Sequence, residues 1–320
     1  MKTVPRWVRL AAAAATLAAV IWRLGAGPLL DGVRAVDGRA LLAAAAIVLV
    51  TTVASAWRWA IVARGLGIHL SLPAAVAAYY RALFLNLTLP GGVVGDVHRG
   101  VSHGRDVDDV GRALRAVAWE RGAGQFVQAV LTVVVLLVLP SPVRSFMPLV
   151  VVAIAATAVV IVLVDRVRGK TGHSRWARLG NAIADDVRAG LLRRKALPAV
   201  VLTSAVVVAG HTVTFLVAAR TVGVDAPVVR MLPLAVLAML AMVLPNIAGW
   251  GPREGATAWV FAAAGLGAHR GVATAVVYGV MVLVASLPGA LVLVVGWFPR
   301  RARSPLTERV PIVARPKTSR

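Results

Sequence analysis

Cysteine is absent from this chain of 320 residues, and charged residues make up only 15% of it. Without cysteine the chain cannot form a disulfide, a thiolate nucleophile or a cysteine-ligated metal site. Its six histidines show no spacing typical of metal ligands, and it contains no G-x-x-x-x-G-K-[ST] loop for ATP. We therefore expect neither a metal site nor a cofactor.

Apolar residues are abundant instead: they make up 59% of the sequence, whereas a soluble domain is about 45–50% apolar. Six uncharged runs each contain at least the roughly 18 residues that cross a bilayer core of about 30 Å. These runs are Ala40–Trp57, Gly122–Val143, Ser145–Val164, Ala196–Ala219, Met231–Pro252 and Gly271–Pro299. An earlier run, Leu10–Trp22, follows basic residues as a signal peptide would, but the six later runs favour a retained first helix. The sequence predicts an all-α polytopic membrane protein.

The charge is mostly positive, with 35 Lys and Arg against 13 Asp and Glu and a net charge of +22. Next to membrane spans, this charge indicates contact with anionic lipid and not with nucleic acid. Two segments are especially basic: 165–195, with nine Lys and Arg, and 299–320, a proline-containing tail that we expect to be disordered. Because basic loops stay inside, we expect both segments and the amino terminus on the cytoplasmic side of a bacterial plasma membrane. The sequence leaves the oligomeric state open.

The predicted orientation divides a transmembrane domain at 1–298 into two halves of opposite topology, about 1–143 and 144–298. Full spans are expected near 8–24, 40–62, 116–139, 146–164, 197–220 and 271–298. The segment 65–115 then begins and ends inside, and 221–270 begins and ends outside, so each enters the bilayer and returns. We predict about six full spans plus two broken or re-entrant helical hairpins, related as an inverted-topology repeat.

Each of these two segments contains a break rich in proline and glycine, "LPGGVVGDVHR" at Leu89–Arg99 and "LPNIAGWGPREG" at Leu244–Gly255. Irregular backbone survives at membrane depth only where protein buries it or where it lines a watery cavity. Paired breaks indicate a substrate site near the midplane, and glycine lets a ligand approach the backbone. The residues expected to contact the substrate are Asn86, Pro90, Gly91, Gly92 and Gly95 at the first break, and Pro245, Asn246, Gly249 and Gly251 at the second. Asn86 and Asn246 are also expected to bind the freed backbone groups.

Two acids, Asp96 and Glu254, follow the breaks at equivalent places. Ionisable residues inside a membrane are rare and usually functional, so both are predicted to face a shared cavity, where they hold a cationic head group or exchange a proton. The alternative is that they cap helices at the membrane surface. Arg81, Arg99 and Arg253 are predicted to neutralise a lipid phosphate, for which the guanidinium is suited. For Arg99 and Arg253, an interfacial position is the alternative.

Four polar residues lie near the start of the predicted span at 116–139. Glu120 and Arg121 indicate either an ion pair that fixes this span against the first hairpin or contact with the ligand. Together with Arg121, the residues Gln125 and Gln128 form a polar stripe at i, i+4 and i+7. Such a stripe lines either a cavity or a helix contact.

Three other polar features receive a structural interpretation. His211, in the middle of a span, is expected to be a packed polar residue, with a proton relay as the alternative. Arg58, between Trp57 and Trp59, is expected to anchor its helix at the level of the lipid head groups. The run "DVDD" at Asp106–Asp109 lies among arginines and is expected on a solvated helix at the cytoplasmic surface.

Three segments resemble the signature of a known family: "LNLTLPGGVVGDVHR" (Leu85–Arg99), "WERGAG" (Trp119–Gly124) and "LPNIAGWGPREGATAWVFAAAGL" (Leu244–Leu266). They are similar to the transmembrane region of lysylphosphatidylglycerol synthases, also called the flippase-like domain family, and the similarity extends to about residue 298. In the two-domain synthases, a soluble carboxy-terminal domain transfers lysine from tRNA to phosphatidylglycerol, and the membrane part flips the product outward. For this chain, which ends in a short basic tail, the resemblance implies no aminoacyl transfer.

The resemblance and the paired breaks together predict a flippase or transporter, and not an enzyme, for a phospholipid or a polyprenyl-linked lipid. The lipid itself is not predicted, because stand-alone relatives are associated with different lipids. One alternative is a membrane-embedded transferase that acts on a lipid-linked sugar or aminoacyl group, with the run at Asp106–Asp109 as its candidate acidic site. The other alternative is a non-transporting scaffold for a neighbouring enzyme.

Overall fold

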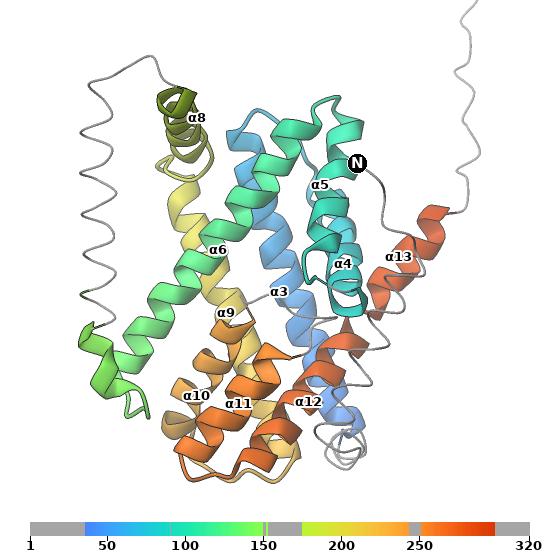
Figure 1. The fold of residues 1–320 in the computed structure, drawn as a ribbon. Helices are drawn as coiled ribbons and strands as arrows, with labels where there is room; N and C mark the ends of the chain where they lie inside the picture. The colour runs from blue at the N-terminus through green and yellow to red at the C-terminus, as the bar shows by residue number, and fades with distance from the viewer. Residues whose placement is uncertain (1–35, 90, 150–151, 153–174, 243–250, 298–320) are drawn as a thin grey trace, which may run out of the picture.

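A computed structural model describes residues 36–89, 91–149, 152, 175–242 and 251–297 (Figure 1). All regular structure in these ranges is helical. The helices are α3 (Gly38–Gly65), α4 (Leu72–Thr88), α5 (Val94–Asp106), α6 (Val110–Val138), the short 3-10 helix η1 (Arg144–Phe146), α8 (Arg175–Gly190), α9 (Ala196–Thr221), α10 (Val228–Ala241), α11 (Pro252–Ala263), α12 (Ala268–Ala285) and α13 (Leu287–Trp297).

Four helical segments are long and apolar enough to cross a membrane: α3, α6, α9, and α12 with most of α13. They confirm the spans predicted at 40–62, 116–139, 197–220 and 271–298. The predicted span at 8–24 and the tail at 299–320 lie outside the described residues, as does most of the predicted span at 146–164. The protein is therefore a multi-pass membrane protein, and the part of it that the structure describes is all-helical.

Side chains cap the first turns of two of these long helices. Asp37 accepts a hydrogen bond from the Ala40 amide (2.7 Å) at the start of α3. Asp109 accepts one from the Arg112 amide (2.9 Å) at the start of α6. Such caps satisfy backbone amides that have no partner within the helix, so each of these acids fixes the residue at which its helix begins.

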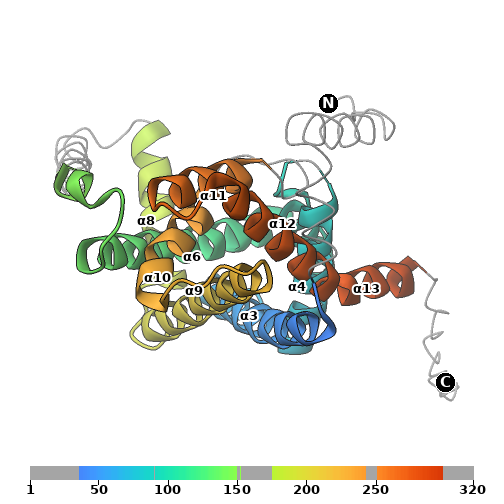
Figure 2. The ribbon, with the colours of Figure 1, turned by 90° about the horizontal axis from the view of Figure 1, so that it is seen from below.

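The predicted span at 271–298 consists of two helices that are separated at Ser286. Pro288 lies in the first turn of α13, where its lack of an amide hydrogen leaves no helical hydrogen bond unmade. α13 projects from one side of the bundle (Figure 2) and packs against α4. This contact is close, because a Cβ added to Gly289 would lie 2.1 Å from the carbonyl oxygen of Tyr80.

The same order of elements occurs twice along the chain. A long helix is followed by two shorter helices and then by another long helix: first α3, α4, α5 and α6, and then α9, α10, α11 and α12. The pair α4–α5 lies toward the upper end of the long helices in Figure 1, and the pair α10–α11 lies toward the lower end. The two short pairs therefore approach the middle of the bundle from opposite ends.

Small residues and aromatic rings hold the helices together. α3 and α9 pack closely, and a Cβ on Gly210 would lie 2.3 Å from Cγ2 of Thr51, as is common where membrane helices meet through small residues. A cluster of three rings joins α9, α11 and α12: the Phe215 ring centroid lies 6.2 Å from that of Phe261 and 6.2 Å from that of Tyr278. The core of the second half is thus apolar and aromatic.

Large apolar side chains also cover the outside of the bundle. Leu42 on α3, Phe126 on α6 and Val295 on α13 are among the most exposed of them. A soluble protein rarely exposes so much apolar surface, whereas lipid tails solvate it. The outer surface is therefore consistent with spans that face hydrocarbon.

Candidate functional site: a central cavity beside buried ion pairs

A cavity of about 240 Å³ lies in the middle of the bundle. Both halves of the chain line it, since α3 to α6 contribute one side and α9 to α12 contribute the other. Gly124, Val208 and Val282 in its wall lie within one residue of the midpoints of their candidate spans. The cavity is therefore about halfway along the membrane-spanning helices.

An asparagine and two glycines determine the backbone conformation of the first break beside this cavity. Gly91 and Gly92 have positive φ angles of 104° and 61°, a conformation that costs glycine little, and Gly92 lines the cavity. Asn86 accepts a hydrogen bond from the Gly95 amide (2.7 Å) and donates one to Asp96 (2.7 Å). The prediction that Asn86 satisfies freed backbone is confirmed.

A bare backbone is also required where α5 contacts α4. A Cβ added to Gly95 would lie only 2.0 Å from the carbonyl oxygen of Ala82. This contact brings the first turn of α5, with Asp96, against the second half of α4. The glycine therefore positions the acid, although its own atoms do not form the cavity wall described here.

Glu120 on α6 is the centre of a buried ion network. Its Oε1 lies 2.6 Å from Nη2 of Arg58, and its Oε2 lies 2.6 Å from Nη2 of Arg99. The Tyr79 hydroxyl also donates to Oε1 (3.2 Å). Glu120 has no exposed side-chain surface, so these charge-assisted hydrogen bonds replace its hydration. Through one carboxylate, helices α3, α4, α5 and α6 are joined.

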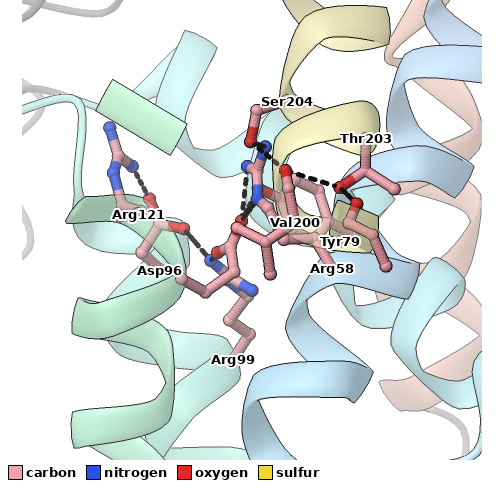
Figure 3. Close-up of polar contacts among 10 residues, drawn as sticks. Arg58, Tyr79, Asp96, Arg99, Arg121, Val200, Thr203 and Ser204 are labelled. Atoms are coloured by element: carbon pink, nitrogen blue, oxygen red, sulfur yellow. Dashed lines mark hydrogen bonds and ion pairs between the residues drawn. The ribbon is translucent and has the colours of Figure 1, made fainter. Parts of the chain in front are cut away.

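Asp96 on α5 is the second acid of this network (Figure 3). Its carboxylate accepts a hydrogen bond from Nε of Arg99 (2.9 Å) and forms an ion pair with Arg121. Arg99 thus bridges both acids, and its guanidinium lies 4.6 Å from the Trp59 ring centroid and 4.3 Å from that of Tyr79. These cation–π contacts add to the stabilisation of a desolvated charge.

The network carries more positive than negative formal charge. It contains the three guanidiniums of Arg58, Arg99 and Arg121 and the two carboxylates of Asp96 and Glu120. Buried ions are tolerated when each is paired and hydrogen-bonded, which these contacts achieve. The formal surplus of one positive charge lies next to the cavity wall.

The second half places a different set of polar groups at the cavity. Arg253 lines the wall, and its guanidinium carbon lies 5.0 Å from the ring centroid of Tyr278. The Tyr278 hydroxyl is 2.8 Å from Nδ1 of His211, and both residues also line the wall. His211 is thus a packed, hydrogen-bonded residue at the cavity surface.

Glu254 differs from Asp96 in what it contacts. Its Oε2 accepts the Gly251 amide (2.6 Å) and its Oε1 accepts Nε of Arg253 (2.9 Å). Gly251 has a φ of 113° and immediately precedes α11, so Glu254 caps its own helix, as the alternative interpretation expected, but not at the surface of the protein. It is buried, but the described cavity wall includes Asp96 and not Glu254.

The remaining predicted site residues fall into three groups. Arg121, Gln125 and Gln128 all line the cavity, so the polar stripe on α6 faces a cavity. The described wall does not include Arg81, Gly91, Gly95, Arg99, Glu120 or Gly251, of which Arg99 and Glu120 lie behind it within the ion network. Pro90, Pro245, Asn246 and Gly249 lie outside the described residues.

The ion pairs of α6 settle one structural alternative. Glu120 and Arg121 each pair with a residue of α5, namely Arg99 and Asp96. They therefore fix α6 against the first hairpin, as one interpretation expected. Arg121 also lines the cavity, so its position allows contact with a ligand as well.

The interpretation of Arg58 as a head-group anchor is wrong. Arg58 is only 5% exposed, it donates hydrogen bonds to Glu120 and to Ser204 (3.0 Å), and it lines the cavity. Trp57 points outward and is 44% exposed, whereas Trp59 is fully buried. The two tryptophans flank Arg58 on different faces of α3, and the sequence alone does not show which face of the helix is buried.

The acidic run at Asp106–Asp109 consists of the last residue of α5, Asp106, and the turn that joins α5 to α6. Asp106 and Asp108 are exposed, and Asp109 caps α6 and pairs with Arg112 (3.0 Å). Within the described ranges, no group of three or more potential ligands is arranged to hold a metal ion. The run is thus solvated, as expected, but only Asp106 belongs to a helix, and the other residues form a turn that ends in the cap of α6.

These helices and their charged cavity define a class: polytopic α-helical membrane proteins with a polar chamber among their spans. More specifically, the chain belongs to the family described as the lysylphosphatidylglycerol synthase TM region, whose profile matches residues 6–289. This confirms the resemblance carried by the two breaks and the Glu-Arg pair. No curated protein and no solved structure matches the chain.

Proposed function

We propose that the protein translocates the polar head group of a membrane lipid, either a phospholipid or a polyprenyl-linked lipid, through the central cavity. The observation that carries this proposal is the position of the cavity. It lies halfway along the candidate spans, and the helices that flank both breaks form its wall. A polar chamber at that depth has little structural value in itself, because ionisable residues inside a membrane are costly.

The wall has the two-sided character that a lipid requires. Its polar part includes Arg58, Asp96 and Arg121, and its apolar part includes Leu87 and Val207. A head group would contact the charged side, while the acyl or polyprenyl chains stay among apolar side chains and lipid tails. A purely soluble substrate would gain nothing from the apolar side.

The repeated order of helices supports a mechanism by alternating exposure. Asp96 is the third residue of α5 and Glu254 is the third residue of α11, and each of these helices follows a break. The two short pairs enter from opposite ends (Figure 1). We therefore interpret α3–α6 and α9–α12 as an inverted-topology repeat with re-entrant hairpins, in which rocking of one half against the other exposes the cavity to each side in turn.

The proposal includes an orientation. Segment 175–195 exposes Arg193, Arg194 and Lys195 next to the start of α9, and this end is expected to face the anionic cytoplasmic leaflet. The amino and carboxyl termini are then cytoplasmic as well. A cysteine introduced at Arg194 should react with a membrane-impermeant thiol reagent only after the membrane is opened.

The test is lipid movement in proteoliposomes. Purified protein is reconstituted with a phospholipid labelled on its head group, and bleaching by an impermeant reductant measures how much label reaches the outer leaflet. We expect labelled lipid to exchange in vesicles that contain the protein, and Asp96→Asn to slow the exchange at least tenfold. Asp185→Asn, the same change at an exposed acid of α8, is the matched control and should exchange like the wild type.

Two outcomes would contradict translocation. Vesicles that contain wild-type protein could bleach like protein-free vesicles, or well-folded Asp96→Asn could exchange at the wild-type rate. The same material separates the alternatives. A transferase would convert lipid in the presence of a donor and lose that activity with Asp108→Asn, and a scaffold would function with Asp96→Asn and Glu254→Gln.

A further inference from the structure

We infer, building on the proposed function, that the transported head group is a net anion whose phosphate replaces Asp96 as the ion-pair partner of Arg121. The first observation is the balance of charge around the cavity. Among the described residues, four guanidiniums lie around it, those of Arg58, Arg99, Arg121 and Arg253, against three carboxylates, those of Asp96, Glu120 and Glu254. The formal surplus of one positive charge is balanced when one negative charge enters.

The second observation is the distribution of that charge between the wall and the layer behind it. In the part of the wall that the described residues form, Arg58, Arg121 and Arg253 line the cavity together with one acid, Asp96. Glu120 and Glu254 lie behind the wall, where they hold arginines in place. A ligand therefore meets mainly guanidinium groups, which match the oxygens of a phosphate in geometry as well as in charge.

The third observation identifies Arg121 as the exchangeable cation. Its side chain is 36% exposed, whereas those of its partner Asp96 and of Arg99 are 8% and 0% exposed. If Arg121 turns to a ligand, the Asp96 carboxylate keeps its contacts with Arg99 and Asn86. Asp96 therefore still has partners after the exchange. A buried carboxylate that lost all its partners would be strongly unfavourable.

Gln125 extends the site by one helical turn. It lies at i+4 from Arg121, on the same face of α6, and both side chains line the cavity. Its side-chain oxygen is buried and has no hydrogen-bond partner among the described residues, which is uncommon for a buried polar atom. A head group that carries hydroxyl or N–H donors beside its phosphate would supply the missing hydrogen bond.

The site would accordingly discriminate among lipids by charge. A phosphodiester with a hydroxylated head group has one negative charge and fits both Arg121 and Gln125. A zwitterionic choline head group returns a positive charge to a wall that is already positive. A lipid with net positive charge, such as one esterified with lysine, is the poorest match.

The experiment measures binding of three short-chain lipids to the purified full chain in detergent. The probes are dihexanoylphosphatidylglycerol (net negative), dihexanoylphosphatidylcholine (net neutral) and its ethyl phosphotriester (net positive). We expect phosphatidylglycerol to bind at least tenfold more tightly than phosphatidylcholine, and the cationic triester to bind most weakly. Arg121→Gln should reduce phosphatidylglycerol binding about tenfold and change phosphatidylcholine binding much less.

Two further variants sharpen the assignment. Gln125→Leu should weaken phosphatidylglycerol binding about threefold, by removing the hydrogen bond to the hydroxylated head group. Arg188→Gln, the same arginine change at an exposed position of α8, is the matched control and should bind like the wild type. The thermal unfolding midpoint of each variant verifies that it is folded.

Equal binding of the three lipids by wild-type protein would overturn the inference, and this comparison needs no variant. An unchanged preference for phosphatidylglycerol in folded Arg121→Gln would overturn the role of Arg121. Either result leaves lipid movement in proteoliposomes intact, so it differs from failure of the proposed function. If the proposed function itself failed, wild-type protein would neither bind any of the three lipids nor move labelled lipid.

Discussion

The first half of the protein, α3 to α6, and the second half, α9 to α12, place different side chains at matching helical positions. Glu120 is the eleventh residue of α6, and Tyr278 is the eleventh residue of α12. Glu120 is held by two arginines and a tyrosine. Tyr278 bonds His211 through its hydroxyl and packs its ring against Arg253.

The acids that follow the two breaks differ in the same way. Asp96 contacts Asn86, Arg99 and Arg121, which belong to three helices. Glu254 contacts Gly251 and Arg253, which adjoin it in the sequence. The first acid therefore joins helices to one another, whereas these contacts of the second acid define the start of a single helix.

Different kinds of contact stabilise the two halves. An ion network is stable only when all of its members are in place, so it specifies one arrangement of α3, α4, α5 and α6. An aromatic cluster gains its energy from buried area and adapts to small shifts. We interpret the first half as the rigid side of the cavity and the second half as the more adaptable side.

The largest expected effect comes from changing the matching residues Glu120 and Tyr278. Glu120→Gln leaves the buried guanidinium of Arg58 without its carboxylate, and should lower the free energy of unfolding by about 3–5 kcal/mol. Tyr278→Phe removes one hydrogen bond and should lower it by about 1 kcal/mol. The free energy is measured by titrating folded protein in mixed micelles with a denaturing detergent. Equal losses for the two variants would remove the distinction between the halves.

A smaller effect is expected from adding one methyl group to each hairpin. In Gly95→Ala, the new Cβ would meet the backbone carbonyl of Ala82, which no change of rotamer relieves, and overpacking of this kind costs about 1–3 kcal/mol. Gly255 on α11 has no atom within 4 Å of a new Cβ. Gly255→Ala should therefore be neutral, or more stable by up to about 1 kcal/mol. The same unfolding titration measures both.

The outcome that would contradict this prediction is a Gly95→Ala protein as stable as the wild type. The pair α4–α5 would then tolerate separation of its helices, and the first hairpin would not be the more closely packed one. Lipid exchange by both variants gives a second readout. A rigid first hairpin predicts slower exchange for Gly95→Ala and an unchanged rate for Gly255→Ala.

The features predicted correctly from the sequence are those set by nearby residues. Runs of apolar residues indicated four of the observed spans, because length and composition alone decide whether a helix can cross a bilayer. The stripe of Arg121, Gln125 and Gln128 followed from helical spacing, and all three line the cavity. The role of Asn86 followed from its place beside a broken helix.

The features that were missed depend on which helices meet. Arg58 was assigned to the membrane surface because tryptophans flank it, but its position depends on Glu120, 62 residues away. Tyr79 and Ser204 were not singled out, since a hydroxyl in an apolar run gives no sign of its partner. Glu254 matches Asp96 by position, yet it accepts a hydrogen bond from the Gly251 amide and therefore caps its own helix.

The smallest expected effect concerns the hydrogen bond that joins the two halves. Nη1 of Arg58 on α3 donates to the Ser204 hydroxyl on α9 (3.0 Å; Figure 3). Ser204→Ala should cost about 0.5–1.5 kcal/mol, because Arg58 keeps its contacts with Glu120. The neighbouring hydroxyl of Thr203 donates to carbonyls of its own helix, so Thr203→Val is the matched control and should cost less than Ser204→Ala. Equal losses of free energy of unfolding in the two variants would mean that the hydrogen bond between Arg58 and Ser204 adds no more stability than an ordinary hydroxyl within a helix. The rigid side of the cavity would then include α3 but not α9.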